Sequence, residues 1–372
     1  MLLLVIPVSI LALLFIAGYF FMRRPAFGQL PAGERLERIQ RSPNYRDGKF
    51  QNQSPTPDLT DGATFISVLR DFIFKRSKQS VPPTPLPSVK TNLAALSPDE
   101  DVLVWFGHSS YFMQLDGKKI LVDPVLSGSA SPLKFTTRSY PGSDAYTADE
   151  IPAIDYLFLT HDHWDHLDHE TILKLKPKTG TVITGLGTGA HLVRWGFDES
   201  SIIECDWNEE IRLEDGFVVY TTPARHFSGR GFKRQQVLWM SFVLQTASRK
   251  LFIGGDSGYD THFAAIGKQH GPFDLAILEC GQYNNSWKHI HMMPEELVQA
   301  GIELGAKHIV PVHWAKFSLA LHSWNEPITR VATEAAKRNV SLLTPLIGKK
   351  LDLDNPETTT DWWKKIKEGL TV

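Results

Sequence analysis

His161-Asp-His-Trp-Asp-His166 places five metal-ligand side chains within six residues. The stretch directly follows Ile154–Thr160, an apolar, β-prone run that predicts a buried strand. Because alternate side chains of an extended backbone point the same way, His161 and His163 can bind one cation while Asp165 and His166 turn toward a second. A metal-free polar loop is disfavoured, since packing imidazoles and carboxylates together without a cation leaves like groups competing. The spacing therefore predicts a two-metal centre.

Further along the chain, three more β-prone runs each lead to a ligand-type residue. The runs are Phe217–Thr222 before His226, Lys250–Gly255 before Asp256, and His308–Val312 before His313. Each signal is weak alone, because an Asp after Gly-Gly is more often a turn residue and a His before Trp more often a packing residue. Together they are typical of a composite site built at the ends of several strands.

Six short motifs surround these ligand residues. They are Gly48-Lys-Phe-Gln-Asn52, Trp105-Phe-Gly-His-Ser-Ser110, Leu121-Val-Asp-Pro-Val125, Gly255-Asp-Ser-Gly-Tyr259, His291-Met-Met-Pro-Glu-Glu296 and Val312-His-Trp-Ala-Lys-Phe317. They resemble motifs of the metallo-β-lactamase superfamily, and within it of the branch around N-acylphosphatidylethanolamine-hydrolysing phospholipase D. The resemblance extends over residues 28 to 345. It implies an α/β (α+β) fold, a four-layer αββα sandwich, and a metal-dependent hydrolase.

The resemblance also distributes the ligands between two cations. It assigns His161, His163 and His226 to the first cation, Asp165, His166 and His313 to the second, and Asp256 to both. The two carboxylates and a bridging hydroxide leave a net positive centre that attracts an anion such as a phosphodiester, and Asp165 and Asp256 thereby count as catalytic. Two Zn²⁺ ions are expected, although the same ligands accept iron or manganese.

Four further residues receive roles around the metals. Asp123 either orients a metal-binding histidine by hydrogen bonding or is an ordinary turn residue before Pro124. His291 is the preferred group to bind phosphate or to protonate the leaving group. His322 shares that prediction, with a surface residue as the equal alternative. For His108 a structural role is favoured over proton transfer.

The beginning of the chain predicts a membrane anchor. Leu2–Met22 is an uncharged apolar run long enough to span a bilayer. Because no Lys or Arg precedes it and Arg23 and Arg24 follow it, we expect an uncleaved single-pass helix with the catalytic domain on the cytoplasmic face. The remaining chain divides into an extension with a Pro-rich linker at 23–98, a catalytic domain at 99–345 and a C-terminal tail at 346–372.

The extension contains a segment with helical spacing of apolar residues. It runs from Phe65 to Ile73 and is followed by Lys75, Arg76 and Lys78. The favoured interpretation is a helix docked on the catalytic domain. The alternative is a membrane-surface helix that helps lipid to reach the site.

Composition restricts the class of function. The chain has 372 residues, of which 42% are hydrophobic and 22% charged, which is enough to bury a full core. The formal net charge of −2 provides no basic footprint for nucleic acid and argues against nuclease function. Cys205 and Cys280 are too few for a disulfide framework.

An anchor, a basic-apolar segment and a cationic centre together favour a membrane phospholipid as substrate and the bilayer as partner. The resemblance makes the leading function the hydrolysis of N-acylphosphatidylethanolamine to N-acylethanolamine and phosphatidic acid by a metal-bound hydroxide. A sugar-phosphate lactonase or other phosphoester hydrolase is the alternative, although a soluble lactone would not explain the anchor. A membrane-tethered metal-binding sensor without turnover is disfavoured, because a site with room for hydroxide suits catalysis. The sequence leaves open whether the protein forms a homodimer.

Overall fold

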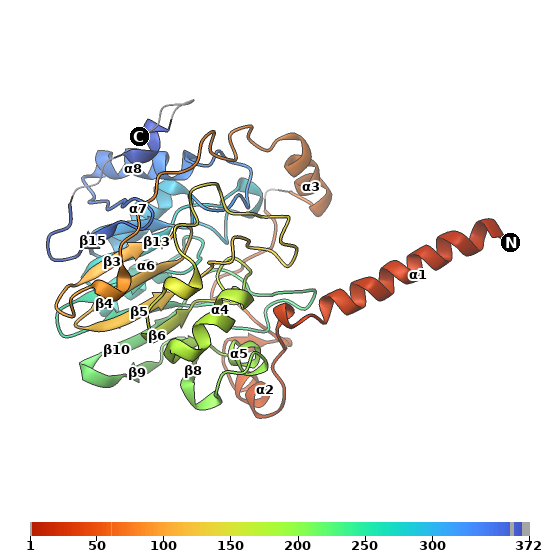
Figure 1. Ribbon diagram of the computed structural model, residues 1–372, viewed down its shortest axis with the longest axis horizontal. Helices are drawn as coiled ribbons and strands as arrows, with labels where there is room; N and C mark the ends of the chain where they lie inside the picture. The colour runs from red at the N-terminus through yellow and green to blue at the C-terminus, as the bar shows by residue number, and fades with distance from the viewer. Residues whose placement is uncertain (1, 61, 358–360, 367–372) are drawn as a thin grey trace.

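The computed structural model describes residues 2–60, 62–357 and 361–366, except for the side chains of residues 2–8. Two β-sheets pack face to face, and helices cover their outer faces (Figure 1). Edge-to-face packing of Phe158 from one sheet against Phe242 from the other, with ring centroids 5.1 Å apart, illustrates the apolar layer between the sheets. This mixed α/β architecture confirms the predicted metallo-β-lactamase sandwich.

The larger sheet has the strand order β15-β3-β4-β5-β6-β7-β8. Its strands are β3 (Val102–Trp105), β4 (Tyr111–Leu115), β5 (Lys118–Val122), β6 (Ile154–Leu159), β7 (Thr179–Gly185), β8 (Ile202–Cys205) and β15 (Lys350–Asp352). From β5 to β8 the strands are parallel. Since the carboxyl ends of parallel strands lie at one edge, Asp123 after β5 and His161 after β6 are brought to the same edge.

The second sheet has the strand order β14-β13-β12-β11-β10-β9. Its strands are β9 (Glu210–Arg212), β10 (Val218–Thr222), β11 (Ser241–Gln245), β12 (Lys250–Ile253), β13 (Phe273–Glu279) and β14 (Ala306–Val312). β12, β13 and β14 are parallel, and β10 runs in the same direction because the antiparallel β11 separates it from β12. The segments carrying His226, Asp256 and His313 therefore leave this sheet at one edge.

Helices on both outer faces complete the sandwich. They are α4 (His169–Leu175) and α5 (Gly189–Arg194) beside the larger sheet, and α6 (His262–His270), α7 (Pro294–Glu303) and α8 (Glu326–Arg338) beside the second. Ile172 and Leu175 of α4 and Leu192 of α5 are buried against strands of the larger sheet. Leu297 and Val298 of α7 are buried in the central core. Each helix thus buries an apolar face, as amphipathic helices do.

The extension and the predicted tail both belong to the folded body. In the extension, α2 (Gly33–Gln40) and the hairpin of β1 (Tyr45–Arg46) and β2 (Lys49–Phe50) bury Ile39 and Phe50 in the central core. In the predicted tail, β15 pairs with β3, and Trp362 and Trp363 are buried against Trp314. Both segments therefore supply core side chains in addition to connecting elements.

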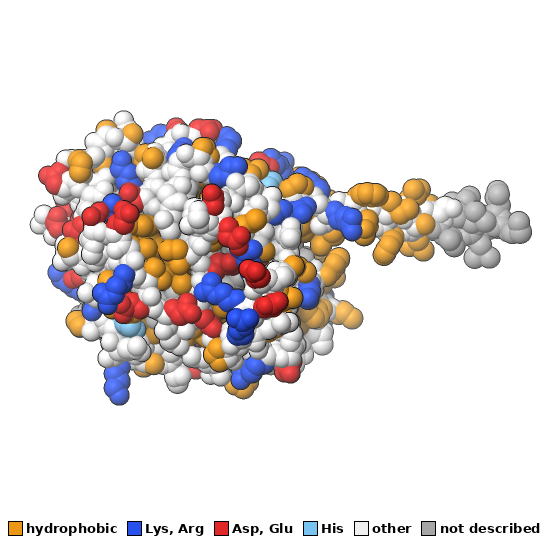
Figure 2. Space-filling view, turned by 90° about the horizontal axis from the view of Figure 1, so that it is seen from below, with side chains coloured by type: hydrophobic (Ala, Val, Ile, Leu, Met, Phe, Trp, Pro, Cys, Tyr) orange, Lys and Arg blue, Asp and Glu red, His pale blue; other side chains and the backbone are white. Residues whose placement is uncertain are grey.

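The first helix, α1 (Leu2–Met22), projects away from the body (Figure 1). Apolar side chains lie along its described part (Figure 2). Within the described residues, no helix has both the length and the apolar character needed to cross a bilayer. The predicted span at 2–22 begins among residues whose side chains lie outside that description.

Candidate metal centre

Three histidines converge on one point at the edge of the sandwich. His161 and His163 follow β6, and His226 follows β10. His161 Nε2 lies 2.9 Å from His163 Nδ1, which lies 3.2 Å from His226 Nε2. A tetrahedral cation with metal–nitrogen distances of about 2.0–2.1 Å holds its ligand nitrogens roughly 3.3–3.4 Å apart. The three nitrogens are therefore arranged as ligands of one ion.

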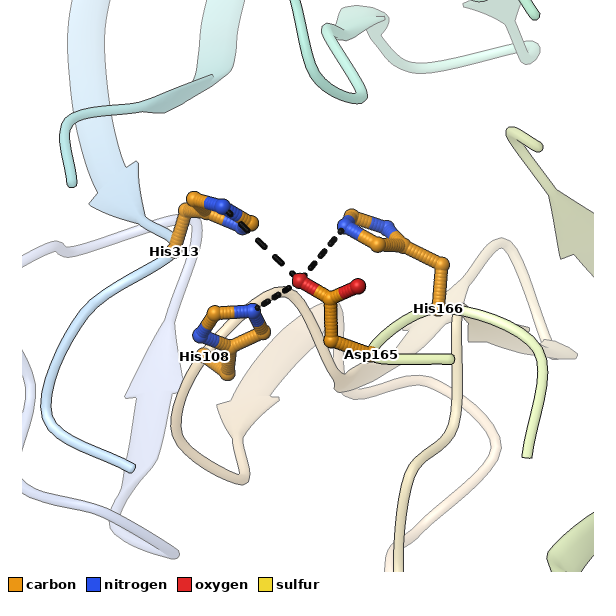
Figure 3. Close-up of side chains that lie close together, drawn as sticks. All are labelled: His108, Asp165, His166 and His313. Atoms are coloured by element: carbon orange, nitrogen blue, oxygen red, sulfur yellow. Dashed lines mark hydrogen bonds and ion pairs between the residues drawn. The ribbon is translucent and has the colours of Figure 1, made fainter. Parts of the chain in front are cut away.

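Asp165, His166 and His313 form a second group beside the first (Figure 3). Asp165 Oδ2 lies 3.7 Å from His166 Nε2 and 4.0 Å from His313 Nε2. His108 joins this group, because its Nε2 lies 2.9 Å from the same carboxylate oxygen. The structure thus brings the predicted second set together. It also places His108 where it steadies Asp165, in line with a structural role.

Asp256 lies between the two groups. Its Oδ2 is 3.1 Å from His166 Nε2 and 3.7 Å from His226 Nε2, and its Oδ1 is 3.2 Å from His313 Nδ1. The carboxylate is buried. One side chain therefore contacts ligand residues of both groups, which is the placement of a bridging ligand.

Several buried polar atoms of this centre have no hydrogen-bond partner among the described residues. They include His166 Nε2, His313 Nε2 and Asp256 Oδ1, which approach charged neighbours without hydrogen-bond geometry. Leaving such an atom unsatisfied costs about 1–3 kcal/mol. Cations at the two positions would satisfy these atoms together, so the residues present fit a pair of metal ions.

The electrostatics agree with metal binding. Burial holds the pKa of His161 well below its usual value and lowers the pKa of His163 to about 4, so both imidazoles are neutral and offer lone pairs. Burial acts to raise the pKa of Asp165 and Asp256, but the surrounding histidines, His166 foremost, together outweigh it and hold both pKa values well below the usual range. Burial acts to lower the pKa of His166, but the three nearby carboxylates together hold it well above its usual value, so a cation at this position would displace a proton. Imidazole nitrogens with anionic carboxylates are a donor set that accepts zinc, iron or manganese.

Asp123, directly after β5, braces the ligand loop. Its Oδ2 accepts a hydrogen bond from Thr160 Oγ1 at 2.6 Å and lies 2.8 Å from His166 Nδ1. Its Oδ1 accepts from the Thr160 amide at 2.9 Å. A carboxylate at Nδ1 leaves Nε2 of His166 free to face a cation. These contacts favour the orienting role of Asp123 over the alternative of a simple turn residue.

His291 lies over the metal centre, with a buried carboxyl group behind it. Its ring stacks on His313 at 5.2 Å between centroids and lies 5.0 Å from His226. Glu279, the last residue of β13, places Oε2 3.4 Å from His291 Nδ1. Burial raises the pKa of Glu279 to about 7, while Glu279 raises the pKa of His291 against the effect of burial. The pair therefore retains a proton near neutral pH.

Glu279 is a site residue that sequence reasoning missed. The sequence does contain a signal for it. Glu279 stands at the end of an apolar β-prone run, just as each predicted ligand residue follows such a run. The signal is weak, since Glu279 is 12 residues from His291 and no local motif joins the two.

His322 lies outside the metal-binding groups found among the described residues. Its Nε2 accepts a hydrogen bond from the Gln282 amide at 2.9 Å, and its Nδ1 donates to the Ser323 carbonyl at 2.9 Å. Both ring nitrogens are thus engaged with the backbone. This geometry assigns His322 to holding two loops together, in place of the phosphate binding or proton transfer that was one of its two predicted alternatives.

The stem, residues 23–29 after α1, packs directly on the ligand loop. The Gln29 amide donates to His191 Nδ1 at 2.9 Å, and the opposite nitrogen, Nε2, lies 3.2 Å from Oδ2 of Asp162. Because Nδ1 accepts a hydrogen bond, Nε2 carries the proton and donates to Asp162, which separates the first two metal ligands. The stem therefore selects the tautomer of His191 that holds this loop.

Arg230 makes a second connection between the stem and the ligand loop. Its guanidinium donates to the carbonyls of Ala26 and Asp162, both at 2.8 Å. The same group lies 3.9 Å from the ring centroid of Trp164, against which Phe27 packs edge-on at 5.1 Å. Arg230 is buried, so these contacts are shielded from water. The N-terminal stem is in this way part of the frame of the metal centre.

Substituting Gly28 tests this connection. A Cβ at Gly28 would lie 1.9 Å from His191 Nδ1, so the Gly28→Ala variant has to displace the imidazole or the stem. We expect the full-length variant to bind metal about 10–100-fold more weakly, the range for lost outer-shell support, in competition with a chelator. Gly62→Ala is the matched control, since its φ of +72° is close to the +71° of Gly28 and a Cβ there meets open space. Equal metal affinities of the two variants would contradict the role of the stem.

Comparison with known proteins agrees with this geometry. The β-lactamase superfamily domain matches residues 118–314. An uncharacterized protein of Mycobacterium tuberculosis is 37% identical over 331 residues, which cover 87% of this chain and 88% of the relative. The N-acyl-phosphatidylethanolamine-hydrolyzing phospholipase D 1 of Caenorhabditis elegans is 27% identical over 229 residues, which cover 58% of this chain and 64% of the relative.

A solved structure shares the fold. The metallo hydrolase of the archaeon Ignicoccus hospitalis is 20% identical, with a TM-score of 0.52 over 68% of this chain and 97% of that one. At this identity the likeness concerns the fold alone. Together with the domain match over residues 118–314, the converging ligands confirm the resemblance seen in the motifs. This chain belongs to the metallo-β-lactamase superfamily of metal-dependent hydrolases.

Proposed function

We propose that this chain is a dinuclear zinc phosphodiesterase of the phospholipase D type, which hydrolyses N-acylphosphatidylethanolamine to N-acylethanolamine and phosphatidic acid. The observation that carries the proposal is the position of Asp256 between two groups of histidines. In this position the Asp256 carboxylate would help to hold two cations, which could then act on one phosphodiester. The relative from Caenorhabditis elegans, by its name, suggests the substrate.

The metal ions and His291 would have different roles in the hydrolysis. When bound, the metal ions supply an activated water and neutralise charge on the phosphoryl oxygens. Hydrolysis breaks the bond between phosphorus and the N-acylethanolamine oxygen, and this oxygen has to take up a proton. His291 lies over His313 beside the centre, and Glu279 favours its protonated form. His291 is therefore the group that donates the proton to the departing alcohol.

The proposal includes attachment of the protein to a membrane by α1, with the catalytic body on the cytoplasmic side. Leu11, Leu13, Leu14 and Phe15 are each 64–76% exposed on this projecting helix. Keeping apolar surface in water costs about 25 cal/mol per Å², a cost that a lipid environment removes. Arg23 and Arg24 follow the apolar run, and basic residues at such a flank favour the cytoplasmic side.

Product analysis tests the proposed reaction. The detergent-solubilised full chain, with its metal content measured, is incubated with N-acylphosphatidylethanolamine, and the products are identified by mass spectrometry. We expect phosphatidic acid and N-acylethanolamine in equal amounts, their loss on chelation and their return on addition of Zn²⁺. Protein that holds two metal ions and cleaves an aryl phosphodiester but not this lipid would overturn the substrate assignment. Protein that holds two metal ions and cleaves neither would overturn the phosphodiesterase assignment.

A further inference from the structure

The helix α3 (Phe65–Phe74) presents an unusual amount of apolar surface to solvent. None of its residues is buried, although Thr64 and Ser67 cap its first turn. Its apolar residues Phe65, Ile66, Leu69, Ile73 and Phe74 are between 63% and 82% exposed. Soluble monomers rarely leave such a cluster uncovered, so this surface indicates an interaction site.

The opposite face of α3 is attached to the body. Phe72 stacks on Trp287, with an angle of 9° between the rings and 6.1 Å between centroids. After the helix, the Ser77 amide donates to the Leu321 carbonyl at 2.9 Å. The structure thus confirms, for one face of α3, the prediction that this helix docks on the catalytic domain. This docking leaves the apolar face of the helix exposed.

A groove runs between α3 and the loop 135–141. It has a volume of about 610 Å³, and its apolar walls include Phe72, Val81 and Phe135. Arg76 and Arg138 also line it. Neither arginine forms an ion pair with a carboxylate among the described residues; Arg76 donates to Ser318 Oγ at 2.7 Å and Arg138 to the Lys134 carbonyl at 3.4 Å. Unpaired guanidinium groups are suited to binding phosphate.

The inner wall of this groove is connected to the metal centre. Leu319, which lines the groove, donates its amide to Gln282 Oε1 at 2.9 Å. The Nε2 of Gln282 in turn lies 3.4 Å from the carbonyl of the metal ligand His313. In Figure 1, α3 lies on the side of the body from which α1 projects. A surface that receives the groove would therefore also receive the anchor.

We propose that this groove binds the headgroup of an anionic phospholipid while the outer face of α3 enters the bilayer surface. The occupant is a bilayer because exposed apolar side chains lie beside Arg76, Arg138, Lys75 and Lys78, the pattern of helices that bind in the interface of anionic membranes. The inference rests on the proposed membrane phospholipid substrate. Contact of α3 and the groove with the bilayer would turn the metal centre toward that substrate.

An environment-sensitive fluorophore on α3 tests the inference in the full chain. The native Cys205 and Cys280 are buried, so a label attaches at an introduced Leu69→Cys. Ile302→Cys is the matched control, an exposed apolar position on α7. The labelled proteins are reconstituted in nanodiscs of phosphatidylcholine alone or with phosphatidylglycerol. We expect a shift of emission to shorter wavelength at position 69 in the anionic discs, and no shift at position 302.

Charge reversal by Arg76→Glu with Arg138→Glu should abolish the shift at position 69 without changing the melting temperature. An unchanged spectrum at position 69 in protein that co-elutes with anionic discs overturns the inference. Protein that fails to co-elute with either disc overturns this inference and the attachment by α1. A shift caused by free glycerol 3-phosphate in detergent would identify a soluble phosphate as the ligand and overturn the lipid assignment. Because the readout is spectroscopic, a failure of the proposed hydrolysis is scored separately by product analysis.

Discussion

We expect the replacement of Asp256 by Asn to lower the turnover of a phosphodiester at least about a thousandfold. Asp256 Oδ2 lies within 3.9 Å of ligand atoms from both groups, and its negative charge would offset part of the charge of two bound cations. Metal ions stabilise charge in a transition state by several kcal/mol, and about 4 kcal/mol corresponds to a thousandfold at 1.36 kcal/mol per factor of ten. Asparagine has nearly the same shape but no charge, so the effect reports on the bridging role.

Metal analysis distinguishes this effect from misfolding. We expect the Asp256→Asn protein to lose about one equivalent of metal on dialysis while its circular dichroism remains unchanged. Asp215→Asn serves as the control, because Asp215 is an exposed turn residue with a φ of 56°, which asparagine also adopts. An Asp256→Asn variant with two firmly bound ions and normal turnover would refute the bridging assignment.

Replacing His291 by Gln should slow hydrolysis more strongly for a substrate with a basic leaving group than for one whose leaving group departs without a proton. General acid catalysis contributes about 10²–10⁴-fold, and it matters most where the departing oxygen is strongly basic. N-acylethanolamine is such a leaving group, whereas p-nitrophenolate departs readily without a proton. We therefore expect a loss of about 10²–10⁴-fold with the phospholipid and of less than about tenfold with bis(p-nitrophenyl) phosphate.

The comparison of the two substrates excludes a purely structural effect of this change. A variant with a damaged metal centre would lose activity toward both substrates equally, as would a variant that binds phosphate less well. Glu279→Gln should show the same selectivity in weaker form, because Glu279 favours the protonated state of His291. His270→Gln, at the end of α6, is the control. Equal losses on the two substrates for His291→Gln would assign His291 to phosphate binding instead.

Local features of this protein were readable from its sequence. The strand predicted at 154–160 is β6 with one residue fewer, and the runs predicted at 217–222 and 250–255 contain β10 and β12. The helix predicted from Phe65 to Ile73 is α3, which is one residue longer. These elements carry their signal in the spacing of nearby apolar residues. The ligand stretch from His161 to His166 is likewise a local pattern.

The roles of single histidines depended on residues far away in the chain. His191 received no role from the sequence, yet it joins Gln29, 162 residues away, to Asp162. For His322 the sequence left open a surface position and a role in phosphate binding or proton transfer, whereas Gln282 and Ser323 engage both of its nitrogens. Which atoms surround an imidazole follows from how loops pack, and no local periodicity encodes that packing.

The sequence by itself determined the superfamily, the positions of several strands and helices, and the identity of the ligand-type residues, because motifs and periodicities lie within short stretches. Only the tertiary structure decided that Glu279 supports His291, that the backbone engages both nitrogens of His322, and that the stem braces the ligand loop. These contacts arise where parallel strands end at a common edge, and strand order joins residues that sequence distance keeps apart.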